Sequence, residues 1–209
     1  MASQSKRHAL VGAPDIWQMK RAFQITFLRS VGLSPNHYLL DIGCGTLRGG
    51  IPIIDYLEPG HYYGIESRAV VLQEGVQELE ECGLQDRSPH LLHVEDMTGC
   101  DLGICFDIVW AFSVLVHFSD EILDKALAFV KRHLSPDGSF YGNVSIGRAL
   151  REDGNWQGFP VVRRPLEFYE RACLNAGLSL KLLGPVRDLG HVSGRPPDLH
   201  EMLQIRHIL

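Results

Sequence analysis

Short apolar runs alternate with amphipathic stretches along most of the chain. Runs rich in leucine, β-branched and aromatic residues predict strands at 39–42, 62–66, 90–94, 106–112, 139–146, 178–183 and 202–208. Apolar positions at helical spacing predict helices at 16–31, 67–81, 119–135 and 165–176, and one more that contains Pro52 and ends before Pro59. Strands that alternate with helices predict an α/β fold with a doubly wound, mostly parallel sheet.

The first part of the chain, 1–35, predicts a helical cap. Asp15 with Gln18 three residues later has the spacing of a capping box, and Gly32 suits the position after a helix end. Such a helix either lies across a ligand pocket or only covers the sheet. At 209 residues, the length predicts one α/β domain over 1–209.

Two segments, 147–164 and 184–198, interrupt the regular pattern and are predicted to be irregular. They carry arginines, aromatic residues and a histidine: Arg148, Arg151, Trp156, Phe159, Arg163, Arg164, Arg187, His191 and Arg195. Loops in such positions often bind substrates, and this composition suits an anionic or planar molecule. Ordinary solvated loops have the same composition, so both interpretations remain open.

Composition narrows the class of protein. The formal net charge of −5 argues against a nucleic-acid partner, which usually needs a basic face. An odd number of cysteines, five, predicts reduced buried thiols in a cytoplasmic protein, and no apolar run is long enough for a membrane span.

The most informative stretch is a buried strand that runs into a turn with two glycines, Gly43 and Gly45. Backbone N–H groups in such a turn can approach a ligand closely because glycine has no Cβ. A phosphate-binding P-loop is excluded, since the chain contains no Gly-Lys pair. A dinucleotide turn needs a third glycine where Arg48 stands, which argues against NAD and FAD.

The sequence Asp41-Ile42-Gly43-Cys44-Gly45 resembles the first motif of the class I S-adenosylmethionine (SAM)-dependent methyltransferases. The chain departs from many members at Leu47, where they have another glycine. The resemblance implies a Rossmann-like sheet of about seven strands with an antiparallel last strand and helices on both faces. It also implies SAM as cofactor and S-adenosylhomocysteine (SAH) as product.

The resemblance extends to the ends of three further strands. Glu66 ends the second predicted strand about 20 residues after the glycine turn, where nucleotide-binding folds place the acid that accepts from ribose hydroxyls. By resemblance, Asp96 accepts from the adenine amino group and Met97 packs on its ring, although Glu95 is one residue from the same role. The implied cofactor-binding residues are Asp41, Gly43, Cys44, Gly45, Glu66, Ser67, Asp96, Met97, Phe112 and Ser113.

His117 follows the fourth predicted strand and is the candidate catalytic residue. Histidine titrates near neutral pH, so this side chain could act as general base or as substrate contact, or only as a local hydrogen-bonding group. His191 and His200 are weaker candidates. No cluster has metal-ligand spacing, so no metal is expected.

The resulting hypothesis is a SAM-dependent methyltransferase that moves a methyl group to O or N of a small molecule. Two alternatives remain: a SAM-binding regulatory protein without catalysis, and a methyltransferase that acts on a macromolecule. A small acceptor is favoured because Ala111-Phe112-Ser113-Val114 stands where enzymes that methylate amino groups of bases or glutamine have an Asn-Pro-Pro-Tyr-like tetrad.

Overall fold

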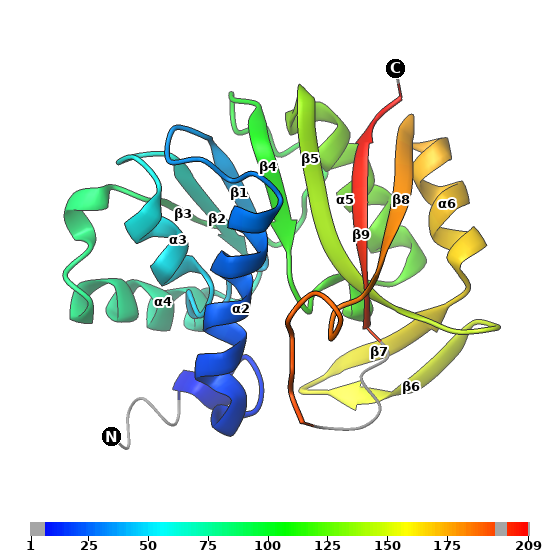
Figure 1. Cartoon of the computed structure of the whole chain (residues 1–209), viewed down its shortest axis with the longest axis horizontal. Coiled ribbons are helices and arrows are strands. Elements are labelled where there is room, and N and C mark those ends of the chain that lie inside the picture. Colours follow the sequence, from blue (N-terminus) through cyan, green and yellow to red (C-terminus); the bar gives the residue numbers. More distant parts are fainter. Residues whose placement is uncertain (1–6, 195–199, 209) are drawn as a thin grey trace. The chain divides into compact units, whose positions relative to one another are not determined.

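The computed structural model describes residues 7–194 and 200–208 (Figure 1). The chain divides into two compact units. The first runs to Asp96 and includes Gly190–Gly194, and the second contains the remaining residues. Each unit is described by itself below.

The first unit contains a parallel sheet of three strands in its described residues, in the order β3-β2-β1. The strands are β1 (Leu39–Ile42), β2 (Tyr62–Glu66) and β3 (His90–His93), close to the predicted ranges. All four residues of β1 are buried, as expected for a central parallel strand, whereas β3 is mostly exposed.

The helices of the first unit are η1 (Pro14–Ile16), α2 (Trp17–Ser30), α3 (Gly50–Tyr56), α4 (Ala69–Glu81) and η2 (Gln85–Arg87). The prediction that Asp15 caps α2 was wrong, because a 3₁₀ turn precedes the helix and no side chain caps its start. The predicted end is confirmed: Gly32, just after the helix, has φ +101°. That is the left-handed region, where glycine is least strained.

The second unit contains β4 (Phe106–Ala111), β5 (Leu134–Ile146), β8 (Leu178–Pro185) and β9 (His200–His207) (Figure 1). β5 pairs in parallel with β4 and antiparallel with β9, which in turn pairs antiparallel with β8. The prediction of an antiparallel last strand is therefore confirmed.

β5 begins earlier than the sequence predicts. Residues 136–138, Pro-Asp-Gly, predict a turn, but they lie inside the strand at a shift of its register against β4. A Cβ at Gly138 would lie 2.8 Å from the carbonyl oxygen of Phe106, so only glycine fits this close approach. The turn signal therefore marks an irregularity within the strand.

The helices of the second unit are η3 (Leu115–His117), α5 (Asp120–His133) and α6 (Leu166–Asn175). Ser119 caps α5: its Oγ accepts a hydrogen bond from the N–H of Ile122 at 3.3 Å. The five cysteines are all free, but only Cys44 and Cys173 are buried, so the prediction of generally buried thiols was wrong.

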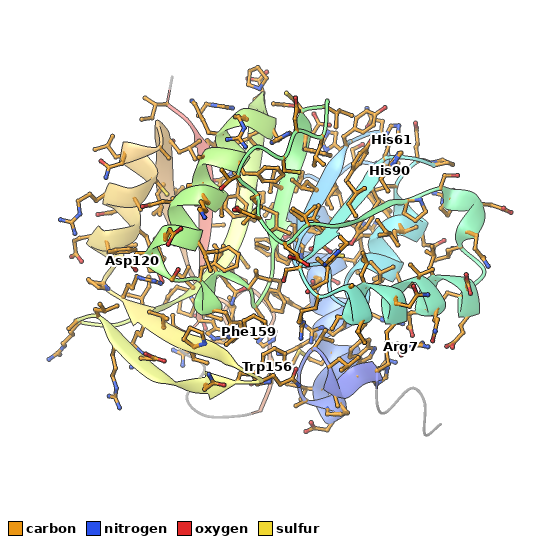
Figure 2. The ribbon with its side chains drawn as sticks, turned by 180° about the vertical axis from the view of Figure 1, so that it is seen from behind. Arg7, His61, His90, Asp120, Trp156 and Phe159 are labelled. Atoms are coloured by element: carbon orange, nitrogen blue, oxygen red, sulfur yellow. The ribbon has the colours of Figure 1, made fainter. Side chains whose placement is uncertain are left out.

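The segment 147–164, predicted to be irregular, is largely a β-hairpin of β6 (Arg151–Trp156) and β7 (Phe159–Arg164). Gln157 and Gly158 form its two-residue turn, both with positive φ. Trp156 and Phe159 flank the turn as a cross-strand pair and lie next to each other in Figure 2. The strand pattern was missed because charged residues and glycine interrupt it.

The segment 184–198 is only partly irregular. Its first two residues complete β8, residues 186–190 form turns, residues 191–194 have no regular structure, and 195–199 lie outside the described residues. Arg195 therefore has no structural description. A role of either segment in substrate binding stays a prediction.

Candidate functional site

The glycine turn after β1 is held to the end of β2. The N–H groups of Gly43 and Cys44 both donate to the carbonyl of Ile65, at 2.8 and 3.1 Å. Gly43 and Gly45 have φ +71° and +59°, and Leu47 also has a positive φ, +57°. Positive φ has little steric cost at the two glycines, whereas the strained Leu47 could not be foreseen from its residue type.

Glu66 lies at the end of β2 and contacts the glycine turn directly. Its Oε2 accepts from the N–H of Gly45 at 3.1 Å, and its Oε1 accepts from the N–H and Nε of Arg68 at 3.0 and 3.1 Å. An ionised carboxylate has about four lone-pair sites, so these three donors leave Oε2 with room for another. The carboxylate thus orders the turn and keeps an acceptor site for a hydroxyl group.

Ser67, which precedes the next helix, does not cap it. α4 starts two residues later, at Ala69, without a side-chain cap, and the Ser67 carbonyl is hydrogen bonded to Nε2 of His93 at 3.0 Å. Instead, the carboxylate of Glu66 accepts a hydrogen bond from the N–H of Arg68, the residue directly before α4.

Asp41 is buried below the turn and accepts a 2.7 Å hydrogen bond from the hydroxyl of Tyr62. Burial raises the pKa of this carboxyl to about 7, although the Tyr62 bond and the nearby charge of Arg48 act in the opposite direction. Burial likewise lowers the pKa of Arg48 to about 10. Asp41 therefore changes protonation near neutral pH.

Residues 7–12, which we call the N-terminal strap, lie on the glycine turn. Arg48 donates to the carbonyl of Val11 at 2.7 Å, and Arg68 donates to that of Leu10 at 3.2 Å. A Cβ at Gly45 would be only 2.9 Å from Cγ1 of Val11. The sequence did not predict either arginine contact. The only signal was Arg48, a basic residue at the position where a dinucleotide-binding turn has glycine.

The outer end of the strap is fixed to α4 by Arg7, labelled in Figure 2. Its buried guanidinium pairs with Glu74, Glu78 and Glu81 at 3.2, 2.6 and 2.8 Å. The hydrogen bonds that Arg7 donates to these carboxylates raise the pKa of Arg7, and the same contact lowers the pKa of Glu81. His8 adds a stacked contact on Trp17, with ring centroids 3.8 Å apart.

Glu95, Asp96 and Met97 follow β3. Glu95 and Asp96 are both exposed, and Glu95 lies 3.5 Å from Nε2 of His93. The carbonyl of Met97 accepts a 3.4 Å hydrogen bond from Arg132, and Met97 is the first residue of the second unit. The roles of Asp96 and Met97 in adenine binding stay predictions.

The turn after β4 carries the predicted residues of the second unit. Phe112 is buried and stacks on Trp110 with 5.5 Å between ring centroids. Ser113 has φ +61°, and its N–H donates to Oδ1 of Asn143 at 2.6 Å. The 3₁₀ turn η3 then leads to His117.

His117 is half-buried and is fixed by the β6–β7 hairpin. Its Nδ1 lies 2.9 Å from the carbonyl oxygen of Pro160, and its ring contacts Trp156 and Phe159 at centroid distances of 5.5 and 6.2 Å. A carbonyl can only accept, so Nδ1 is the donor and, in the neutral ring, Nε2 is the basic nitrogen. The contact thus selects the tautomer that suits a general base.

The weaker candidates have structural contacts. The ring of His191 meets that of Phe23 edge-on at 5.1 Å, and the residue is buried in the first unit. Nδ1 of His200 lies 3.2 Å from Nδ2 of Asn143. Their catalytic roles stay untested hypotheses.

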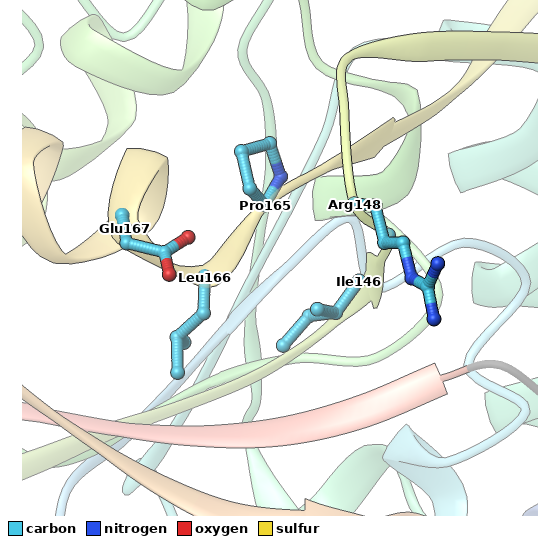
Figure 3. Close-up of a pocket in the computed structure, with 6 residues that line it drawn as sticks. Ile146, Arg148, Pro165, Leu166 and Glu167 are labelled. Atoms are coloured by element: carbon cyan, nitrogen blue, oxygen red, sulfur yellow. The ribbon is translucent and has the colours of Figure 1, made fainter.

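A hollow of about 520 Å³ lies in the second unit, where β5 ends and α6 begins (Figure 3). Arg148 and Glu167 provide opposite charges, and Ile146 and Leu166 provide apolar walls. The hollow is largely open to solvent. The sequence predicted Arg148 as a substrate-loop residue and gave no signal for Glu167.

Within the described ranges, no group of histidine, cysteine and carboxylate side chains could hold a metal ion. In the same part of the chain, no helix has the length and hydropathy of a membrane span.

Residues 40–140 match the family model described as a methyltransferase domain. Magnesium protoporphyrin IX methyltransferase from Synechocystis PCC 6803, solved with bound SAM, is similar with a TM-score of 0.69 and 14% identity, over 99% of this chain and 90% of that chain. The glycopeptide N-methyltransferase MtfA, complexed with sinefungin, has a TM-score of 0.70 at 15% identity, over 90% and 94%. No curated protein matches the chain.

A SAM-dependent methyltransferase from Clostridium acetobutylicum ATCC 824 is also similar, with a TM-score of 0.66 and 12% identity, over 91% of this chain and 92% of that chain. These similarities confirm the predicted Rossmann-like fold, and the family model confirms the predicted methyltransferase domain.

Proposed function

We propose that the chain is a class I SAM-dependent methyltransferase that methylates O or N of a small molecule, as its methyltransferase domain match and its fold support. SAM supplies a methyl group already activated on sulfur, and SAH is the product. The protein has to hold the acceptor atom in line with the methyl–sulfur bond and remove a proton where the acceptor carries one. Positioning of this kind can lower a barrier by roughly 7–11 kcal/mol.

The first unit supplies the main contacts to the cofactor in this proposal. The N–H groups of Gly43, Cys44 and Gly45 already donate to Ile65 and Glu66, so this turn would contribute a close backbone approach to the amino-acid end of the cofactor. The remaining acceptor site of Glu66 would bind a ribose hydroxyl. Asp41, two residues before Gly43 and hydrogen bonded to the hydroxyl of Tyr62, is assigned to the amino end of the cofactor, directly or through water. The remaining proposed contacts are Cys44, Ser67, Asp96, Met97, Phe112 and Ser113.

The observation that carries the catalytic part is the hydrogen bond from His117 to the carbonyl of Pro160. It fixes the tautomer in which Nε2 accepts a proton, as a general base requires. A base of this kind contributes roughly 10²–10⁴-fold to a reaction rate.

The proposed acceptor is small and aromatic or anionic. Trp156 and Phe159 offer flat apolar surfaces beside His117, and the hollow with Arg148 and Glu167 suits a polar substituent. The solved relatives include one named for a porphyrin substrate and one named for a glycopeptide. A net charge of −5 disfavours a nucleic-acid acceptor, and free cysteines favour a cytoplasmic location.

Calorimetry with SAM, SAH, NAD and ATP tests the cofactor. We expect binding of SAM and SAH only, and binding of NAD with neither adenosyl compound would contradict the proposal. Turnover of radiolabelled SAM with metabolite extracts then separates an enzyme from a regulatory protein that binds SAM without methyl transfer. Label in protein or RNA fractions alone would favour a macromolecular acceptor.

A further inference from the structure

The turn after β4 is held in a conformation that its own sequence does not favour. Ser113 has φ +61°, a region that side chains other than glycine, asparagine and aspartate rarely adopt. Such strained residues persist only when surrounding contacts determine their conformation. The contact that does so here comes from β5.

Asn143, a fully buried residue of β5, accepts the N–H of Ser113 on Oδ1 at 2.6 Å. Its amide nitrogen lies 3.2 Å from Nδ1 of His200 on β9. The N–H of Ser113 can only donate and the ring nitrogen can accept, so the two partners fix which end of the amide faces the turn. A single side chain thus links β9 and β5 to the strained turn.

Gly142, the residue before Asn143, packs against the segment that follows Ser113. A Cβ at Gly142 would lie 2.6 Å from Cδ1 of Leu115, so the 3₁₀ turn η3 packs directly on the backbone of β5. The hairpin carbonyl of Pro160 then holds the far end of the segment through His117. Positions 113, 115 and 117 are therefore each fixed by a different partner.

We propose that Asn143 is a positioning residue that sets the place and orientation of His117 through the turn 113–117. This inference rests on the proposed function, in which His117 is the base. A base must lie within hydrogen-bond reach of the proton it removes, and a displacement of about 1 Å can cost on the order of 100-fold in rate. Asn143 acts by holding the turn and need not contact the substrate.

The first test needs no acceptor. Nitrogen-15 NMR of the SAH-bound protein reports the tautomer and titration of His117, and we expect the Nδ1–H form in the unmodified chain. Asn143→Ser shortens the side chain and removes the bond to Ser113, so the signal should move toward a mixture of both tautomers. Asn143→Asp keeps an oxygen acceptor and should restore it, and Asn175→Ser, on an exposed helix end, should leave it unchanged.

The second test measures turnover of radiolabelled SAM on a fixed mixture of phenols and aromatic amines. At saturating SAM, Asn143→Ser should lower the rate roughly 10–100-fold, and adding it to His117→Ala should lower the rate no further. Ser113→Gly relieves the strained φ and should reduce the loss caused by Asn143→Ser.

The outcomes separate the two proposals. A His117 signal in Asn143→Ser identical to that of the unmodified chain overturns the positioning role. Additive losses in the double variant also overturn it while leaving His117 as base. Full activity of His117→Ala instead overturns the base, and failure to bind SAH overturns the cofactor assignment.

Discussion

The turns after β1 and after β4 both contain residues with positive φ, and they stabilise that conformation in different ways. Each follows a buried parallel strand and needs positive φ to change direction. The first uses glycine at 43 and 45, where that conformation has little steric cost. The second uses Ser113 and relies on Asn143, thirty residues away along the chain.

This difference decides what a sequence can reveal. Glycine is the residue type that best tolerates positive φ, so the first turn can be predicted from its own residues. The second turn depends on a side chain from another strand, and its sequence carries no sign of positive φ. The first turn is therefore specified locally and the second by tertiary contacts.

The largest expected effect concerns the second turn. His117→Ala should lower turnover by roughly 10²–10⁴-fold with little change in SAM affinity, because a lost base affects the chemical step. Rates at several pH values and calorimetry measure the two quantities. His90→Ala, which removes an exposed ring stacked on Tyr63, is the matched control. A fully active His117→Ala enzyme would leave this histidine only its structural contacts.

Glu66→Ala addresses the ligand contact of the first turn. Hydrogen bonds to a charged group contribute roughly 1.5–3 kcal/mol, so SAM affinity should fall at least tenfold. Calorimetry measures the affinity, and circular dichroism checks the fold, since Glu66 also accepts from the N–H groups of Gly45 and Arg68. Exposed Glu80→Ala is the control. Unchanged affinity in a folded variant would show that the ribose lies elsewhere.

Two opposite substitutions, Gly45→Ala and Ser113→Gly, test the comparison between the two turns. Gly45→Ala should destabilise the fold by roughly 1–3 kcal/mol, because alanine is strained at φ +59° and its Cβ meets Val11. Ser113→Gly should cost less than this, since glycine accepts positive φ. Denaturant unfolding measures both. Gly60→Ala, also at positive φ but with no atom within 4 Å of the new Cβ, isolates the contribution of strain alone.

The smallest effect concerns the carboxyl below the first turn. Folding raises the pKa of Asp41 from 3.8 to about 7, so the folded chain retains a proton that the unfolded chain releases. Its contribution to stability is therefore present at low pH and lost as pH rises through about 7, by roughly 1–2 kcal/mol between pH 5.5 and 7.5. Asp41→Asn should remove that part of the pH dependence in thermal unfolding. An identical pH profile would mean that Asp41 is ionised throughout.

The sequence predicted the regular framework well. Strands β1, β2 and β4 lie where their apolar runs place them, because parallel strands buried on both faces leave a continuous apolar signal. The β6–β7 hairpin was missed since charged residues obscure its alternation. The strap was missed because its contacts join Val11 to Arg48 and Arg7 to α4, over distances that no local pattern records.

The Arg7 cluster has a practical consequence for handling the protein. Glu74, Glu78 and Glu81 lie on successive turns of α4 and share one cation from the strap. A truncation that removes Arg7 would take this cation from Glu74 and Glu81, while Glu78 keeps its ion pair with Arg21, so the repulsion between carboxylates at helical spacing would be less well compensated. Affinity tags and fluorophores are therefore better attached at the C-terminal end. If proteolysis removed Arg7, a loss of cofactor binding could not be told apart from destabilisation of α4.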